Sequence, residues 1–292
     1  MNLRHPQFFT LNFSLLTSLS RTLLLLAMAC AVVMAAASPA NASDGSEKWK
    51  RVVETKLVAE WQDVFMRPGE ALAQKMLAFN NVIAKSTGGP TVPIYLTAEA
   101  ACVKLTEQTR QFIREQLAGK SGFELRDALG YLTIDIGFSF RVKADGVLIM
   151  TNNERQIRWL ASEASDGGEK WKHLLDVKLV DEWQPIFIDA YVDPEHGRPP
   201  RPAETLAQKM IAFNKVIAKS TGGQTVPIYL SPEAATVQYP KQEKPRGVHI
   251  MIAIVSVSLR DTLRYVTDIS GVRFKITDEG VLIFAPPKPA KK

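Results

Sequence analysis

The chain has 292 residues, of which 46% are hydrophobic and 23% are charged, and its formal net charge is +6. The basic residues are scattered, apart from a small cluster at 288–292, so this mild excess does not indicate a nucleic-acid partner. Two cysteines, Cys30 and Cys102, are too few for a disulfide framework.

Residues 1–42 have the layout of a secretory signal peptide. They contain no acidic residue, and an apolar run at 23–37 precedes Ala-Asn-Ala at 40–42, which fits a cleavage site between small residues. We therefore expect cleavage near Ala42 and a periplasmic or secreted mature chain. The run is short and rich in alanine for a membrane-spanning helix of about 20 residues. A retained anchor and lipidation at Cys30 are the alternatives.

Much of the remaining chain occurs twice. Residues 72–101 and 206–235 align without a gap at an offset of 134 residues and differ at 5 of 30 positions. Upstream, 47–61 matches 169–183 at an offset of 122, so the second copy carries an insertion of 12 residues centred on the proline-rich stretch 193–202. We interpret this pattern as a tandem duplication of one module.

The repetition predicts an α+β protein of two small modules, each with helices packed on a small mixed or antiparallel sheet. We expect the first repeat at 47–150 and the second repeat at 169–285, with a linker at 151–168 between them. A basic, proline-rich tail follows at 286–292.

Each repeat opens with a tryptophan-rich segment. Trp49, Val53, Leu57 and Trp61 fall on one helical face, which predicts a helix, or a strand for the later part of the segment. Because the tryptophans recur at one spacing in both repeats, we expect them to be core anchors.

The next helix is the clearest in the chain. Its apolar residues recur at helical spacing, and two glycines follow as a stop signal. The segment TVPIYL then predicts a short strand, and Pro93 favours a position at a sheet edge because proline cannot donate to a ladder. The helical residues are Leu72, Met76, Phe79 and Ile83, with counterparts Leu206, Met210, Phe213 and Ile217, and the second proline is Pro227.

The end of the second repeat predicts the order strand, helix, strand, strand. Residues 248–258 are rich in β-branched side chains and run into a helix that Ser258 and Asp261 cap at its start and Gly271 ends. Alternation from Val272 onward, with an Asp-Glu-Gly turn, predicts a hairpin.

Residues 255–284, with Leu-Arg-Asp at the start of the helix, resemble the secretin and TonB short N-terminal domain. The resemblance covers about 35 residues of each repeat. It implies a small α+β domain at the periplasmic side of the envelope that contacts partner proteins and performs no chemistry. The first repeat departs from this pattern, since 114–123 is polar and predicts helix, and Glu124 replaces the capping Ser258. We therefore expect one strand of the first repeat to be lost or rebuilt.

No catalytic, metal or cofactor motif stands out. Lys85, Ser86 and Thr87 occur in both repeats but lack the partner motifs of penicillin-recognising enzymes, and the glycines follow them, unlike those of a P-loop. The histidines are not spaced to share a helix face. Recent duplication explains the shared AKSTGG segment more simply than a function does.

The sequence thus favours a non-enzymatic adaptor that binds an envelope protein and contacts the membrane only through partners. The expected route is pairing of a sheet edge with an extended segment, and the candidate partner-binding residues are Val248, Ile250 and Ile252. The alternative for that strand is an internal position buried on both faces. The alternative functions are a self-assembling structural protein and, less favoured, an enzyme with an unrecognised site.

Overall fold

The computed structural model describes residues 44–117, 122–151, 169–187, 204–239 and 257–286. The helices are η1 (Asp44–Trp49), α2 (Lys50–Val53), α3 (Trp61–Met66), α4 (Leu72–Thr87), α5 (Ala98–Cys102), α6 (Glu107–Leu117), α7 (Leu125–Asp135), α9 (Glu169–Leu175), η2 (Asp181–Trp183), α10 (Gln184–Phe187), α11 (Leu206–Ser220), α12 (Pro232–Ala235) and α13 (Leu259–Ser270). The strands are β1 (Ile94–Thr97), β2 (Phe138–Lys143), β3 (Gly146–Thr151), β4 (Glu204–Thr205), β5 (Ile228–Leu230), β6 (Gln238–Tyr239), β7 (Arg273–Thr277) and β8 (Gly280–Phe284).

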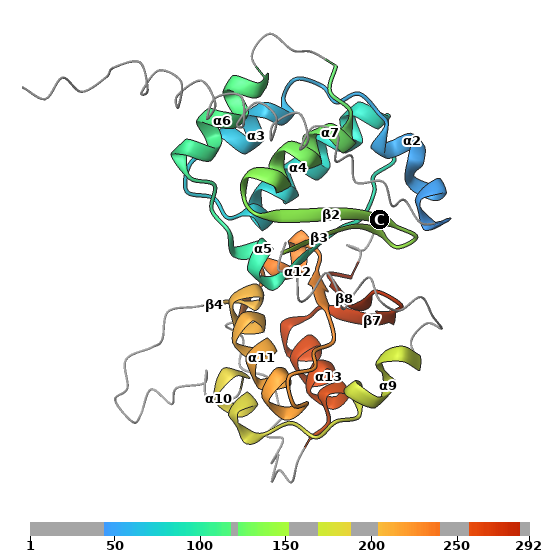
Figure 1. The fold of residues 1–292 in the computed structure, drawn as a ribbon, viewed down its shortest axis with the longest axis vertical. Coiled ribbons are helices and arrows are strands. Elements are labelled where there is room, and N and C mark those ends of the chain that lie inside the picture. The colour runs from blue at the N-terminus through green and yellow to red at the C-terminus, as the bar shows by residue number, and fades with distance from the viewer. Residues whose placement is uncertain (1–43, 118–121, 152–168, 188–203, 240–256, 287–292) are drawn as a thin grey trace, which may run out of the picture. The chain divides into compact units, whose positions relative to one another are not determined.

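The predicted α+β class is confirmed, but the two repeats share one sheet. Six strands are ordered β2-β3-β1-β5-β8-β7, and β4 pairs with β6 in a separate two-stranded sheet. The hairpins β2–β3 and β7–β8 form the two ends of the large sheet (Figure 1). Within each repeat the TVPIYL strand runs parallel to the second strand of the hairpin, and β1 and β5 pair antiparallel.

The expectation that Pro93 and Pro227 mark a sheet edge is wrong, because β1 and β5 are the two central strands. Each proline lies immediately before the first paired residue of its strand, so the ladder needs no N–H from it. The proline carbonyls are used instead. Pro93 O accepts a hydrogen bond from Val147 N at 2.8 Å, and Pro227 O accepts one from Val281 N at the same distance.

The two long repeated helices are confirmed as α4 and α11. Gly88 adopts a φ of 72° at the C-terminal end of α4, the left-handed conformation expected of a glycine stop. The prediction of one continuous opening helix is wrong. The chain forms η1 and α2, leaves the helix after Val53 and makes an antiparallel bridge from Lys56 to Glu124 before α3 begins. The alternative, that the later part of the segment is extended, is correct only for the single bridge at Lys56.

Helices cover one face of the large sheet. Alternate strand residues on that face, including Ile94, Leu96, Ile228 and Leu230, join the main hydrophobic core with the apolar sides of the helices. The predicted tryptophan anchors belong to this core, since Trp61, Trp171 and Trp183 are buried and Trp49 packs against it. A second, smaller cluster lies on the opposite face.

The segment 114–123 of the first repeat begins as predicted, because α6 continues to Leu117. Residues 118–121, and 240–256 in the second repeat, lie outside the described residues. Around these gaps the repeats match: Leu57 N donates to Phe123 O at 2.7 Å, and Leu179 N donates to Val257 O at 2.9 Å. In the described part of the chain, no helix is long and apolar enough to cross a membrane.

Candidate functional site

The predicted partner-binding residues Val248, Ile250 and Ile252 lie outside the described residues, and so does the insertion at 193–202. The structure does describe the end of that predicted strand and the start of α13. Val257 O accepts the hydrogen bond from Leu179 N that ties this end to the opening segment of the second repeat.

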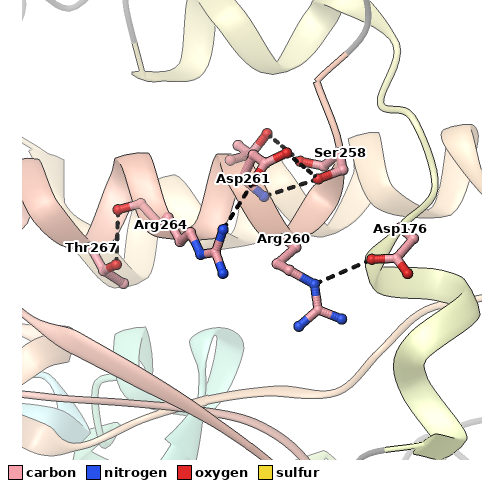
Figure 2. A network of polar contacts seen from close by, with 7 residues as sticks. Asp176, Ser258, Arg260, Asp261, Arg264 and Thr267 are labelled. Atoms are coloured by element: carbon pink, nitrogen blue, oxygen red, sulfur yellow. Dashed lines mark hydrogen bonds and ion pairs between the residues drawn. The ribbon is translucent and has the colours of Figure 1, made fainter.

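A network of polar contacts surrounds the start of α13 (Figure 2). Ser258 Oγ accepts a hydrogen bond from Asp261 N at 3.1 Å and donates one to Asp261 Oδ2 at 2.7 Å, which confirms the predicted cap. Arg260 Nε donates to Asp176 Oδ1 at 3.2 Å, so it fastens α13 to the residue after α9. Leu259 is fully buried. All three residues of the Leu-Arg-Asp motif therefore have structural contacts of their own.

The AKSTGG segment also has structural contacts in both repeats. Ser86 Oγ accepts a hydrogen bond from Val58 N at 3.0 Å and donates one to Val82 O at 2.8 Å. In the second repeat, Ser220 Oγ does the same with Val180 N and Val216 O, at the same distances. The serine thus ties the opening segment of each repeat to its long helix, which explains the repetition of this residue without a reaction.

We expect Ser86→Ala to lower the free energy of unfolding by about 1–3 kcal/mol, because Val58 N would lose its partner in a partly buried place. Ser220→Ala should cost the same in the second repeat. Urea unfolding followed by tryptophan fluorescence measures both. Thr91→Ala, at an exposed position, is the control and should change stability by less than about 0.5 kcal/mol. An equal, small effect of all three variants would contradict the structural role of the serines.

The lysine of the same segment forms an exposed ion pair in each repeat, Lys85 with Glu60 and Lys219 with Glu182. The hydrogen bond from the lysine is the main cause that lowers the pKa of each glutamate below its ordinary value. A lowered pKa in the folded state means that the pair stabilises the fold at neutral pH. This stabilisation is lost as the pH falls through the lowered pKa.

We expect Lys85→Met to raise the pKa of Glu60 back toward that of an ordinary glutamate. Glu182, which keeps Lys219, should keep its lowered pKa and serves as the internal control. A carboxyl-detected NMR titration of the variant measures both groups in one sample. A pKa of Glu60 that does not move would show that Lys85 is not the cause.

The small cluster on the face opposite the main core contains two equivalent tyrosines, Tyr95 and Tyr229, packed with Leu148, Met150 and Leu282. Burial raises the pKa of both phenols. Tyr229 is fully buried, and within the described residues its hydroxyl has no hydrogen-bond partner. A phenol held neutral in this way is a packing group and a poor general base.

Ion pairs connect the two ends of the sheet across this face. Lys143 Nζ lies 2.8 Å from Glu279 Oε1, and Lys275 pairs with Asp145. In a flat sheet β2 and β7 would be roughly 24 Å apart, at about 4.8 Å for each strand spacing. That distance is longer than two side chains can span, so the sheet must curl until its two end hairpins approach each other. The tyrosine cluster therefore lies on the concave side.

Strand β7 is one edge of the large sheet in the described part of the chain, where β8 is the only strand paired with it. The opposite edge, β2, also contacts η1. A tryptophan donates to the turn of each end hairpin, Trp49 Nε1 to Ala144 O at 3.0 Å and Trp171 Nε1 to Asp278 O at 3.1 Å. Side chains of β7 alternate between two faces. Arg273 and Lys275 are on the concave face, whereas Phe274 and Ile276 pack, half-buried, against the main core.

Strand β7 itself carries two cations, whereas Asp278 and Glu279 lie in the turn that follows it. Arg273 is exposed, and no carboxylate among the described residues forms an ion pair with it. Lys275 keeps 41% of its side chain exposed despite its pairing with Asp145. We take β7 as the candidate functional site: a strand edge with cations on one face and apolar side chains on the other.

Among the described residues, no group of three histidine, cysteine or carboxylate side chains could hold a metal ion. Burial raises the pKa of the half-buried Cys102 thiol, which disfavours a reactive thiolate. Sequence reasoning predicted β7 as a strand but missed it as a site. The exposed Arg-x-Lys alternation was the available signal.

Comparison with family models, with curated proteins and with solved structures found no match for this chain.

Proposed function

We propose that this protein is a non-enzymatic adaptor of the bacterial cell envelope, exported by its N-terminal leader, that binds an extended segment of a partner protein. The observation that carries the proposal is the edge strand β7, which has one described neighbour and a regular alternation of cationic and apolar side chains. An added strand would satisfy the outer N–H and C=O groups of β7, and the alternating side chains would select its sequence.

The chemistry of β7 specifies the partner. On the concave face, residues of an added strand would lie beside Arg273 and Lys275, which favours aspartate or glutamate. On the other face they would lie beside Phe274 and Ile276, which favours apolar side chains. The expected partner segment therefore alternates acidic and apolar residues over about five positions, the length of β7.

A second route stays open through Val248, Ile250 and Ile252, which the sequence predicts as a strongly β-forming strand. Binding there would favour an apolar partner segment without the acidic alternation. The two routes are separable by substitution of Arg273, which belongs to β7 and not to the segment 248–252.

Selection of displayed peptides on the folded chain from Ser43 onward tests the proposal. We expect enrichment of extended sequences that alternate acidic and apolar residues. Arg273→Glu should weaken their binding about ten-fold or more, because it places like charges side by side. Arg126→Glu makes the same charge change at an exposed position on α7 and is the matched control.

Three results would count against β7 as the site. These are no enriched alternating sequence, equal binding by the two arginine variants, or binding that salt does not weaken. Circular dichroism of both variants establishes that the fold is intact, as expected for substitutions at exposed positions that form no ion pair with another described residue.

A further inference from the structure

The two repeats meet through equivalent elements. Leu96 of β1 pairs with Leu230 of β5, and these two residues occupy the same position of the repeat, at the offset of 134. The helices that follow the strands cross over: α5 contacts α11, and α12 contacts α4. We call this set of elements the joint. It has the form of an isologous contact, in which the same surface is used on both sides.

The joint is also where the repeats are most alike. Five of its six elements fall within 72–101 and 206–235, the two segments that differ at only 5 of 30 positions, and α5 extends one residue further, to Cys102. Helices and strands elsewhere, such as α6 and β7, have diverged much further. Both sides of the joint therefore present nearly the same surface.

The differences inside the joint preserve its shape. Thr97 and Ser231 are equivalent, and each side chain accepts a hydrogen bond at the start of the following short helix, from Ala100 N and Ala234 N respectively. Pro232 replaces an alanine at the first position of α12. Proline is well accommodated there because that N–H has no partner within the helix.

The two residues that form the polar contact across the joint also occur in both repeats. Asn214 Nδ2 donates to Glu99 Oε1 at 3.4 Å. Both repeats carry these residue types at these positions, since Asn80 and Glu233 are the counterparts. A first repeat placed against another first repeat would bring Asn80 to Glu99, and Leu96 to Leu96.

We propose that the joint accepts a second copy of this chain: two chains open their own joints and pair their repeats with each other. Each repeat has one joint surface, so two chains that exchange repeats close into a dimer with both joints satisfied. This inference is independent of strand addition at β7, which lies at the far end of the sheet order.

The expected concentration dependence follows from the linkage of the repeats. The same contacts form within a chain and between chains, so their energies nearly cancel. The balance is set by the effective concentration of one repeat near the other, on the order of millimolar for modules tied by a short linker. Opening must expose buried residues such as Leu96 and Leu230, which makes exchange slow. Dimers should therefore form on refolding at high concentration and persist after dilution.

Engineered disulfides test this in the chain from Ser43 onward, which forms one compact unit. The background is Cys102→Thr, because threonine occupies the equivalent position 236. Leu96→Cys with Leu230→Cys in one chain should cross-link within the chain. Leu96→Cys alone can cross-link only if β1 meets β1 of another chain. A mixture of the two single variants reports β1 against β5 of another chain.

We expect oxidation after refolding to give disulfide-linked dimers of the single variants, of their mixture, or of both, in proportions that rise with the concentration during refolding. Phe112→Cys, at an exposed position on α6, gives the background of random cross-linking. The proposal would be overturned if neither the single variants nor their mixture gave more dimer than this background. In that case only the double variant would form its disulfide, within one chain.

Light scattering on the chain without engineered cysteines covers the case in which Leu96→Cys impairs folding. Refolding at increasing concentration should yield a growing fraction with the mass of two chains. The mass of one chain at every concentration would overturn exchange. Dimers that form without cross-links at the joint would overturn the assignment of the joint as the contact.

Discussion

Gly280→Ala is expected to lower the free energy of unfolding by about 3 kcal/mol or more, through strain and a disturbed hydrogen bond. Gly280 has a φ of +131°, and a Cβ atom there would lie 2.2 Å from Pro227 O. That carbonyl cannot retreat easily, because it accepts the hydrogen bond from Val281 N. The hairpin β7–β8 would have to move away from β5. Urea unfolding followed by circular dichroism measures the loss.

The chain offers two comparisons for this substitution. Gly146 is the counterpart in the first repeat, with its Cβ position 2.2 Å from Pro93 O, so Gly146→Ala should be equally costly. Gly130 lies within α7 and has open space where a Cβ would be. Gly130→Ala should stabilise the fold by about 0.5–1 kcal/mol. If Gly280→Ala and Gly130→Ala had the same effect, the close approach of hairpin and central strand would be contradicted.

The parts of the fold that could be predicted are those with local causes. Helical periodicity and glycine stops located α4, α11 and α13, and Ser258 marked the start of α13 because its hydroxyl caps the nearest backbone N–H. The hairpin β7–β8 followed from alternation around a short turn. Each of these signals lies within about fifteen residues of sequence, the range over which helices and hairpins set their own geometry.

The shared sheet could not be predicted from local patterns. Pro93 suggested a sheet edge, but its strand is central, since a proline just before the first paired residue leaves the ladder intact. Whether a strand is central or at an edge depends on partners far away in the sequence. Leu96 and Leu230 meet across 134 residues, and no periodicity within either repeat indicates that contact.

The candidate site was missed for the same reason. The alternation of Arg273 and Lys275 with Phe274 and Ile276 predicts a half-buried strand, but it does not tell whether a further strand lies beside it. Only the order of the six strands identifies β7 as an edge. Conversely, the conspicuous residues Ser86 and Arg260 have structural contacts that a motif search cannot distinguish from functional ones.

The contact between the repeats leads to the second large effect. Leu96→Ala and Leu230→Ala should each lower the free energy of unfolding by about 2–5 kcal/mol, the range for a fully buried leucine. Both side chains are 0% exposed, and each belongs to the main core that the repeats share. Because their Cα positions are paired across β1 and β5, the first truncation already loosens the place where the second acts. The double variant should then lose less than the sum of the two, by about 0.5–3 kcal/mol.

A double-mutant cycle in urea measures this coupling. Leu96→Ala and Leu263→Ala are the matched pair, because Leu263 is as fully buried as Leu96 but lies on α13, which mainly contacts α9 and β7. That pair should be additive within about 0.5 kcal/mol. The cycle also tests whether the repeats unfold together. If the joint holds them in one cooperative unit, each leucine variant shifts a single transition detected by the tryptophans of both repeats. Two separate transitions, with Leu96→Ala affecting only one, would mean that each repeat is stable without the other and that the joint contributes little.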